Sequence, residues 1–418
     1  MYRILHIVGG ELNGGAARGA YWLHLGLKRL GVDSKILTNS FDTLGDKDVI
    51  TVADSTKNKI KVKFYSHLDA LPVSLYRNRK EIIFSTGFAG GNIFNTDILK
   101  DIDIVHLHWI NAGFVNIKYL SCIKKPIVWT MRDMWPMTGG CHYTMGCNSY
   151  SSNCGQCPQL GSKLSFDISS LIIARKKKYF PKTIKLVGIS SWLSECAQQS
   201  SLFHEFDIQT ISNNIDTTQF FPVDKIVARN ILGIPQDVKV ILAGATNLEN
   251  FYKGFDKFLA AITYLPNDKI HVVFLGTLSQ GALKKINFPC TNLGYLHDTV
   301  SLRIAYSAAD VFVAPSIMDA FGKTLAEAMS CGTPTVCFDA TGPKDIVDHK
   351  QNGFRAKPFD PKDLAYGIQW LLHQDEQQYR KISDNAKEKV KKYFDNYVIA
   401  KRYKKLYSSI LEAEHSHC

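Results

Sequence analysis

The segment that most constrains the fold of this chain covers residues 314–334, with the sequence APSIMDAFGKTLAEAMSCGTP. It separates two apolar runs that predict strands, at 311–313 and 335–338. Its middle predicts a glycine-containing turn and then an amphipathic helix that begins at Lys323. A strand–turn–helix order places the helix N-terminus at the carboxyl edge of a parallel sheet, where α/β proteins bind anionic ligands.

Two carboxylates flank this turn: Asp319 precedes it, and Glu327 lies in the second turn of the predicted helix. Carboxylates accept hydrogen bonds from sugar hydroxyls, whereas backbone amides donate to phosphate oxygens. The segment therefore predicts a site for a ligand that carries both hydroxyls and a pyrophosphate. An ordinary βα turn is the competing interpretation, although such a turn does not need both acids.

The spacing of the two acids, the turn FGKTL and the run EAMSCGTPTV resemble the signature of family 4 retaining glycosyltransferases. The resemblance implies the GT-B fold, an α/β architecture of two doubly wound Rossmann-like domains facing across a cleft. It also implies that Glu327 holds the ribose hydroxyls of a nucleotide sugar and that Asp319 holds the donor sugar. The first acid of that family is usually Glu, which is one methylene longer than Asp319.

The resemblance extends to the rest of the donor site. After the strand predicted at 238–244, Lys253 matches a lysine that grips the donor pyrophosphate in the family, whereas Ala245 stands where the family has Arg. Arg132 or Lys323 is expected to replace that missing cation. The predicted donor-binding residues are Gly14, Gly15, Gly276, Lys253, Asp319, Phe321, Gly322, Lys323, Thr324, Leu325 and Glu327.

Arg132 follows the strand predicted at 126–130, at a position where the family commonly has a His that contacts the donor sugar. A guanidinium is permanently charged and only donates hydrogen bonds, so it cannot act as a base. We expect Arg132 to hold a phosphate or a sugar hydroxyl. The predicted catalytic residues are Asp319, Glu327, Lys253 and Arg132.

Gly14 and Gly15 belong to a glycine-rich loop between an apolar strand, residues 3–8, and a helix. Glycine permits a positive φ and a close approach of the backbone to a ligand, so the loop fits a ligand-facing role. A tight βα turn explains the same residues equally well. In the resembled family this loop faces the cleft.

Three domain segments are predicted along the chain. Residues 211–216 resemble the interdomain linker of the family, which places an acceptor-side Rossmann-like domain at 1–212 and a nucleotide-sugar-binding Rossmann-like domain at 213–390. Apolar residues between 390 and 410 recur at helical spacing and predict one last helix. This helix, within 391–418, is expected to cross back to the first domain.

The loop at 138–160 concentrates four thiols in the pattern C-x5-C-x6-C-x2-C: Cys141, Cys147, Cys154 and Cys157. This pattern fits a tetrahedral structural zinc site, but it also fits reduced structural thiols or a redox pair. No cofactor is expected for catalysis. The loop with its DMWPMTGGCHY sequence resembles the branch of family 4 that builds colanic-acid-like exopolysaccharides.

The charge of the chain indicates an anionic partner. The formal net charge is +12, and 45% of the residues are hydrophobic. Lys and Arg concentrate at 57–80, interleaved with apolar residues, and at 175–178. An anionic membrane surface and a solvated helix face both explain the first cluster. Nucleic acid is not expected, because few aromatic residues for base stacking accompany the charges.

The sequence contains neither an apolar run of transmembrane length nor an N-terminal signal pattern. Its ten cysteines without a leader favour a reducing compartment. We therefore expect a cytoplasmic protein that associates peripherally with the inner face of the cytoplasmic membrane.

These features together predict a retaining glycosyltransferase. It would move a hexose from a nucleoside-diphosphate sugar, with UDP-hexose expected as donor, to a growing lipid-linked exopolysaccharide or surface glycan. The alternatives are another GT-B enzyme, such as a sugar-nucleotide epimerase or a phosphorylase, and a basic nucleic-acid-binding α/β protein.

Overall fold

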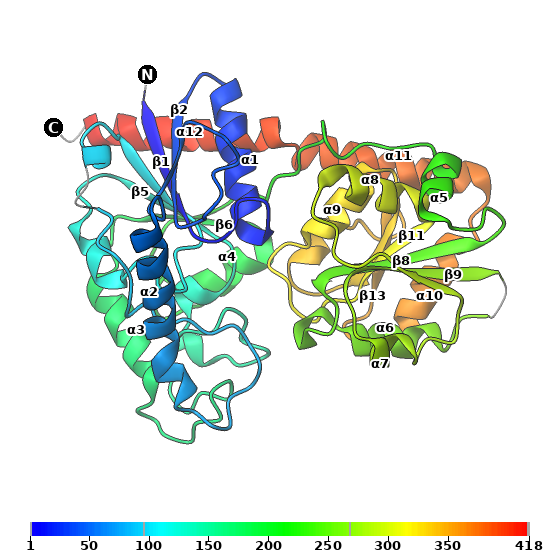
Figure 1. Cartoon of the computed structure of the whole chain (residues 1–418), viewed down its shortest axis with the longest axis horizontal. Coiled ribbons are helices and arrows are strands. Elements are labelled where there is room, and N and C mark those ends of the chain that lie inside the picture. Colours follow the sequence, from blue (N-terminus) through cyan, green and yellow to red (C-terminus); the bar gives the residue numbers. More distant parts are fainter. Residues whose placement is uncertain (1, 95–96, 267–268, 416–418) are drawn as a thin grey trace. The chain divides into compact units, whose positions relative to one another are not determined.

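The computed structural model describes residues 2–94, 97–266 and 269–415 and divides into two compact units (Figure 1). The first unit comprises Met1–Ser212 with Ile399–Cys418, and the second comprises Asn213–Val398. Each unit is built on its own parallel sheet. The two units therefore are two Rossmann-like α/β folds, as the sequence predicts.

The sheet of the first unit has seven parallel strands in the order β3-β2-β1-β4-β5-β6-β7. Its central strands are buried except at Arg3, the first residue of β1, as expected for a parallel sheet that helices cover on both faces. In chain order its strands are β1 (Arg3–Val8), β2 (Asp33–Thr38), β3 (Val49–Thr51), β4 (Ile104–Leu107), β5 (Ile127–Met131), β6 (Lys185–Gly188) and β7 (Ile208–Thr210).

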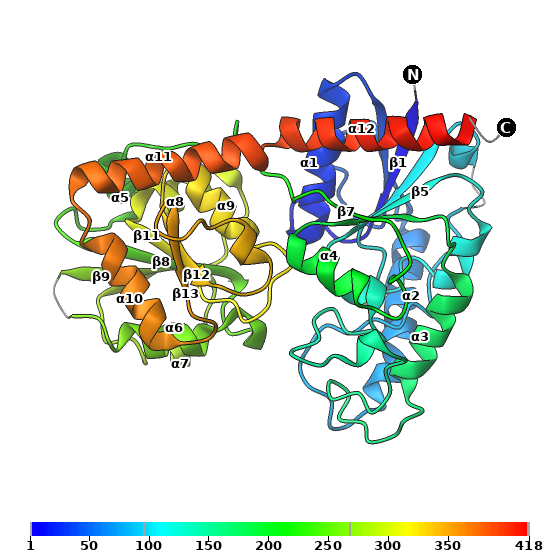
Figure 2. The same ribbon diagram turned by 180° about the vertical axis from the view of Figure 1, so that it is seen from behind.

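The helices of this unit are α1 (Gly15–Arg29), α2 (Thr56–Ser74), α3 (Ile168–Tyr179), α4 (Ser191–Gln198) and α12 (Asn396–His415), which enters the unit at Ile399. Short 3-10 turns are η1 (Asp97–Leu99), η2 (Ile117–Cys122), η3 (Trp135–Met137) and η4 (Ser149–Ser151). Helix α12 runs across the strands and buries Tyr403 and Tyr407 against the same core as Ile4 and Val128 (Figure 2).

The second unit has six parallel strands in the order β10-β9-β8-β11-β12-β13. They are β8 (Lys239–Asn247), β9 (Ile270–Thr277), β10 (Cys290–Asn292), β11 (Val311–Ala314), β12 (Thr335–Phe338) and β13 (Gly353–Ala356). The helices are α5 (Lys225–Leu232), α6 (Phe255–Ile262), α7 (Gln280–Leu283), α8 (Thr299–Ala308), α9 (Lys323–Ser330), α10 (Pro361–Leu372) and α11 (Glu376–Tyr393), with 3-10 turns η5 (Phe251–Lys253) and η6 (Gly342–Asp345).

The end of the chain forms two helices where the sequence predicts one. The break lies at Phe394 and Asp395, because the chain there pairs with the linker: Ile215 N donates to Phe394 O at 2.8 Å, and Asn396 N donates to Ile215 O at 2.9 Å. Helix α11 packs on α9 and stays in the second unit. The chain therefore returns to the first unit at Ile399, eight residues after the predicted position 391.

The basic cluster predicted at 175–178 is only partly a surface feature. Lys176, in α3, is 0% exposed, and its ammonium donates to the carbonyls of Trp135 and Thr138. The Arg175 guanidinium stacks on Phe88, 4.7 Å from the ring centre. Among the described residues, no helix combines the length and apolar character that a membrane span requires.

Candidate active site

The turn between β11 and α9 has the predicted strand–turn–helix form. Gly322, the N-cap residue, has φ 94° and ψ 51°, a left-handed conformation that glycine adopts without a steric penalty. The Oδ1 atom of Asp319 accepts hydrogen bonds from the amides of Phe321, at 3.2 Å, and Gly322, at 3.0 Å. The carboxylate thus fixes the turn and lies beside the positive end of the helix dipole.

Lys253 reaches the same carboxylate from η5, after β8. Its Nζ lies 2.7 Å from Asp319 Oδ2, and the two side chains are 23% and 19% exposed. Burial opposes both charges, yet the mutual attraction prevails: the pKa of Asp319 is lowered and the pKa of Lys253 is raised. Both groups are therefore charged at neutral pH.

Backbone contacts hold η5 against the turn. The carbonyl of Tyr252 accepts hydrogen bonds from the amides of Ile317 and Met318. A Cβ at Gly254 would lie 2.0 Å from the Pro315 carbonyl oxygen, so only glycine allows this approach. Residues about sixty positions apart in the sequence thus meet at the carboxyl edge of β8 and β11.

Glu327, the second predicted acid, is 3% exposed. Its Oε2 accepts a hydrogen bond from the Tyr306 hydroxyl of α8 at 2.9 Å. This hydrogen bond holds the side chain of Glu327, which belongs to α9, against α8. Glu327 lies in the second turn of α9, whereas Asp319 precedes the helix.

Within the part of the chain that the structure describes, three helices begin on a glycine and have no side-chain cap: α1 at Gly14, α6 at Gly254 and α9 at Gly322. Eight other helices carry a Ser or Asp cap that accepts a backbone amide, namely Ser55, Asp167, Ser190, Asp224, Ser279, Asp298, Asp360 and Asp375. First-turn amides have no acceptor within their own helix, and a phosphate can supply one.

The remaining predicted donor residues fall into two groups. Phe321 and Leu325 are 2% and 0% exposed, so their side chains belong to the core. Lys323 and Thr324 are half-buried at the start of α9. For Phe321 and Leu325, contact with a ligand would therefore come from the backbone.

Gly276 has a structural explanation. Its φ is 117°, and a Cβ there would lie 1.6 Å from the Ala245 carbonyl oxygen. Its amide donates to Gly294 O at 2.7 Å. The glycine thus permits the close approach of β8, β9 and the segment after β10.

In the first unit, Gly14 and Gly15 lie at the start of α1. The Gly14 amide donates to Glu11 O at 3.0 Å, which closes the turn. Gly15 has φ 43°, and a Cβ there would meet no atom within 4 Å. The space around Gly15 therefore leaves room for a ligand group.

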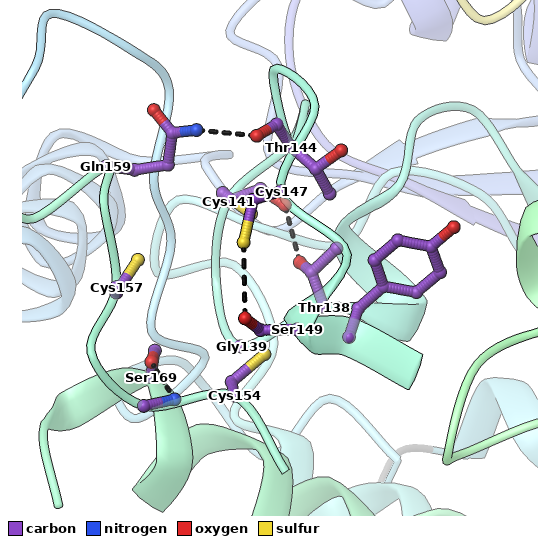
Figure 3. A pocket seen from close by; sticks show the side chains of 12 residues that line it. Thr138, Gly139, Cys141, Thr144, Cys147, Ser149, Cys154, Cys157, Gln159 and Ser169 are labelled. Carbon is purple, nitrogen blue, oxygen red and sulfur yellow. Dashed lines mark hydrogen bonds between the residues drawn. The ribbon is translucent and has the colours of Figure 1, made fainter. Parts of the chain in front are cut away.

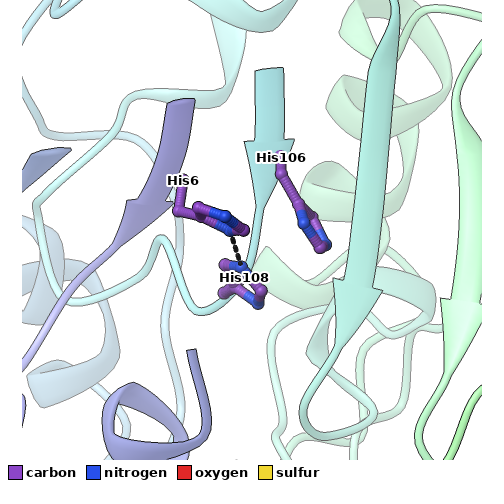
Figure 4. Close-up of side chains that lie close together, drawn as sticks. All are labelled: His6, His106 and His108. Atoms are coloured by element: carbon purple, nitrogen blue, oxygen red, sulfur yellow. Dashed lines mark hydrogen bonds between the residues drawn. The ribbon is translucent and has the colours of Figure 1, made fainter. Parts of the chain in front are cut away.

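Arg132 lies beside three buried histidines that the sequence did not reveal as a group. Figure 4 shows the three histidine side chains close together. This histidine cluster consists of His6, His106 and His108, whose ring nitrogens lie within 4.8 Å of one another. His6 Nδ1 is 2.9 Å from His108 Nε2, and an Arg132 nitrogen is 3.2 Å from His108 Nδ1. The cluster depends on the pairing of His6 with His106 across β1 and β4, which only the strand register shows.

Charge argues against a cation in this cluster. Burial lowers the pKa of all three histidines well below the usual value, so they are neutral. Burial also lowers the pKa of Arg132 to about 10, which leaves the guanidinium cationic at neutral pH. A divalent metal ion would lie next to this positive charge, which is electrostatically unfavourable.

A second cluster of polar side chains lies near the end of β5. The Asp133 Oδ2 atom lies 2.6 Å from His142 Nδ1 and accepts a hydrogen bond from Trp109 Nε1 at 3.1 Å. The Ser85 hydroxyl lies 3.0 Å from His142 Nε2. His142 was noted in the sequence only as part of the cysteine-containing loop, because its partners come from three separate segments.

The predicted metal ligands lie in one pocket of the first unit. Cys141, Cys147, Cys154 and Cys157 all line it (Figure 3). This pocket is formed entirely by residues 138–169 and contains none of the predicted donor residues.

The architecture of the chain is that of the GT-B glycosyltransferases. Sucrose-phosphate synthase from Thermosynechococcus elongatus has a similar structure, with a TM-score of 0.72 and 19% identity over 99% of this chain and 100% of that one. HepE from Anabaena, solved in complex with UDP-glucose, has a TM-score of 0.64 and 17% identity over 98% and 100% of the two chains. At these identities the similarity establishes the fold.

Residues 224–389, in the second unit, match the family model described as Glycosyl transferases group 1. The matched stretch includes Lys253, Asp319 and Glu327. Over nearly the whole chain the protein is 26% identical to an uncharacterized glycosyltransferase of Methanocaldococcus jannaschii, covering 96% of this chain and 95% of the relative.

Two further relatives match over shorter stretches. WcaC of Escherichia coli strain K12, provisionally named for colanic acid biosynthesis, is 25% identical over 60% of this chain and 62% of its own length. The N,N'-diacetylbacillosaminyl-diphospho-undecaprenol alpha-1,3-N-acetylgalactosaminyltransferase of Campylobacter jejuni is 28% identical over 48% and 54%. The chain thus spans little more than half the length of these two relatives.

Proposed function

We propose that the protein is a retaining glycosyltransferase that moves a hexose from a nucleoside-diphosphate sugar to a growing lipid-linked exopolysaccharide or surface glycan. The observation that carries the proposal is the Lys253–Asp319 pair at the uncapped N-terminus of α9. A cation and backbone amides directed to one place suit a diphosphate, and an adjacent carboxylate suits sugar hydroxyls.

The donor diphosphate would lie over the start of α9. The ammonium of Lys253 has three N–H donors, so it can keep Asp319 and still donate to a phosphate oxygen. Together with backbone amides of the first turn of α9 it would stabilise the charge that develops on the leaving diphosphate. Asp319 would hold the donor sugar, and Glu327 the ribose hydroxyls.

Retention of anomeric configuration needs no separate strong base in this scheme. The departing phosphate oxygen takes the proton of the acceptor hydroxyl while the glycosidic bond to the diphosphate breaks and the new one forms on the same face. Arg132 remains cationic and so donates hydrogen bonds without taking part in proton abstraction.

Three similar proteins support the proposed donor, acceptor and product classes. The solved HepE structure contains UDP-glucose, which supports UDP-hexose as the donor. The Campylobacter jejuni enzyme is named for an undecaprenol diphosphate acceptor, which supports a lipid-linked acceptor for this chain. WcaC supports an exopolysaccharide as the product.

Helix α2 supports the proposal that the enzyme works at an anionic membrane surface. Apolar side chains follow one another along the helix at intervals of three or four residues and are 38–77% exposed: Ile60, Phe64, Leu68, Leu71 and Leu75. We call these residues the α2 stripe. Exposed lysines accompany it at positions 57, 59, 61 and 63. An apolar stripe with neighbouring cations is typical of helices that lie in an anionic lipid interface.

Co-sedimentation with vesicles of phosphatidylglycerol and phosphatidylcholine tests the α2 stripe. The double variant Phe64→Ser, Leu71→Ser should bind at least about 10-fold more weakly, because each lost apolar side chain removes about 1.5–3 kcal/mol of transfer free energy. Ile226→Ser with Ile231→Ser in α5 is the matched control, since these residues are 61% and 60% exposed. Equal losses in both double variants, or none in the first, would contradict membrane docking through α2.

The transferase activity is tested by incubating the purified chain with UDP-glucose and an undecaprenol-diphosphate-linked acceptor. The expected result is acceptor-dependent release of UDP and a product with the same anomeric configuration as the donor, read by NMR. Isomerised nucleotide sugar without UDP release would indicate an epimerase. A phosphate requirement would indicate a phosphorylase, and binding to oligonucleotides that exceeds binding to nucleotide sugars would favour the nucleic-acid alternative.

A further inference from the structure

We propose that Cys141, Cys147, Cys154 and Cys157 bind one structural zinc ion as a tetrathiolate site in the first unit. The four side chains line a cavity of about 20 Å³, enough for a single water-sized atom (Figure 3). Its other lining residues are Thr138, Gly139, Thr144, Ser149, Tyr150, Gly155, Gln159 and Ser169. No carboxylate or imidazole lines it, so the donor set is sulfur, which selects zinc over magnesium or calcium.

A buried cation offers charge compensation. A zinc ion with four thiolates carries a net charge of −2. Lys176 is 0% exposed, and its Nζ donates at 2.9 Å to the carbonyl of Thr138, which lines the same pocket as the four cysteines. The proposed site would place a negative charge close to this buried amine, and opposite charges attract strongly where water is excluded.

The backbone of the loop is strained in a way that calls for a cross-link. Met145, Cys154 and Gln156 have φ values of 51°, 54° and 46°, in the left-handed region that non-glycine residues rarely adopt. The apolar cluster beneath the loop is small: Cys157 and Leu160 pack with Val73 of α2, and the partly buried Tyr76, Phe84 and Ile168 pack against them. A metal ion would supply the cohesion that so few apolar contacts do not.

The sulfurs must move closer together to bind the ion. In the described parts of the chain, the histidine cluster is the only group of three or more potential ligands whose atoms all lie within 4.8 Å of one another, so no three of the sulfurs lie that close together. A Zn–S bond of about 2.3 Å in a tetrahedron places sulfurs about 3.8 Å apart. Zinc binding would therefore contract the pocket.

This contraction would stabilise the region around Asp133. Cys141 immediately precedes His142, the partner of Asp133. The loop is also joined to the segment after α2, because Lys80 N donates to Gln159 O and Ser85 N donates to Gly140 O. The zinc ion would act as a structural cross-link and would not contact substrate.

Metal analysis of the full chain, purified without a metal-affinity tag or chelator, is the direct test. About one zinc per chain is expected, and fewer than about 0.2 would overturn the proposal. Iron in place of zinc would overturn the choice of metal. A chain mass two hydrogens below that of the fully reduced chain would show a disulfide between two of the cysteines. This result would contradict the zinc site and favour a redox pair.

Variants locate the ion and keep the test independent of activity. Cys141→Ser and Cys154→Ser should each lose at least about 80% of the zinc, whereas Cys122→Ser, at an exposed cysteine of the same unit, should keep it. If the ligand variants do not fold, cobalt titration of the metal-depleted wild-type chain decides. The visible absorption of tetrahedral cobalt–thiolate at one equivalent is expected, and its absence refutes the site.

Discussion

Replacing Lys253 with Met tests the donor site most selectively. The side chain keeps its length and loses its charge, and Lys253 Nζ lies 2.7 Å from Asp319 Oδ2 at the start of α9. A charge-assisted hydrogen bond contributes about 1.5–3 kcal/mol. Each 1.4 kcal/mol is tenfold in affinity, so UDP should bind roughly 10- to 150-fold more weakly to Lys253→Met.

Isothermal titration calorimetry with UDP and with uridine measures this effect. Lys253 is proposed to contact the diphosphate, so the variant should lose affinity for UDP and keep its affinity for uridine, which has no phosphate. Lys257→Met is the matched control, because Lys257 is a nearby lysine that also pairs with an aspartate: its Nζ lies 3.4 Å from Asp256 Oδ2. Unchanged UDP affinity in Lys253→Met, or an equal loss for uridine, would refute the proposed contact.

Three further predictions concern other parts of the molecule. Glu327→Gln should lower kcat/KM for the donor roughly 10- to 150-fold by removing a charged acceptor, and steady-state kinetics with varied donor checks this. Gly276→Ala places a Cβ 1.6 Å from Ala245 O and should lower the free energy of unfolding by roughly 2–4 kcal/mol in urea titrations; a loss under 1 kcal/mol is incompatible with the geometry. Burial lowers the pKa of each histidine of the cluster below its value in the unfolded chain, so the unfolded chain binds more protons at acidic pH. The free energy of unfolding should therefore fall as the pH drops below about 6.5, by about 1.4 kcal/mol per pH unit for each histidine. His6→Asn should make this slope shallower, and an unchanged slope would show that His6 does not titrate on unfolding.

Local patterns were sufficient for much of the fold. The strand–turn–helix at 311–330 is visible because apolar runs flank a glycine turn, and the structure has β11 and α9 there. The resemblance of the motifs to a known family predicted the GT-B architecture, and the similarity to solved structures supports it. The prediction of a single last helix was wrong, because the break at Phe394 depends on pairing with Ile215, which lies far away in sequence.

The details of the site depend on contacts that spacing does not encode. The sequence shows Lys253 and Asp319 as separate residues, and only the packing of η5 on the turn brings them together. It also suggests that Lys176 belongs to a surface cluster, whereas the structure buries it, since helical position decides exposure. The histidine cluster required the register of β1 with β4.

The central claim is that the N-terminus of α9 and Lys253 receive the diphosphate of a nucleotide sugar. A crystal structure of the chain with UDP bound tests it most directly. The account predicts phosphate oxygens within hydrogen-bonding distance of backbone amides in the first turn of α9 and of Lys253 Nζ, with the ribose hydroxyls at Glu327. A diphosphate bound elsewhere on the second unit, with the start of α9 unoccupied, would contradict it.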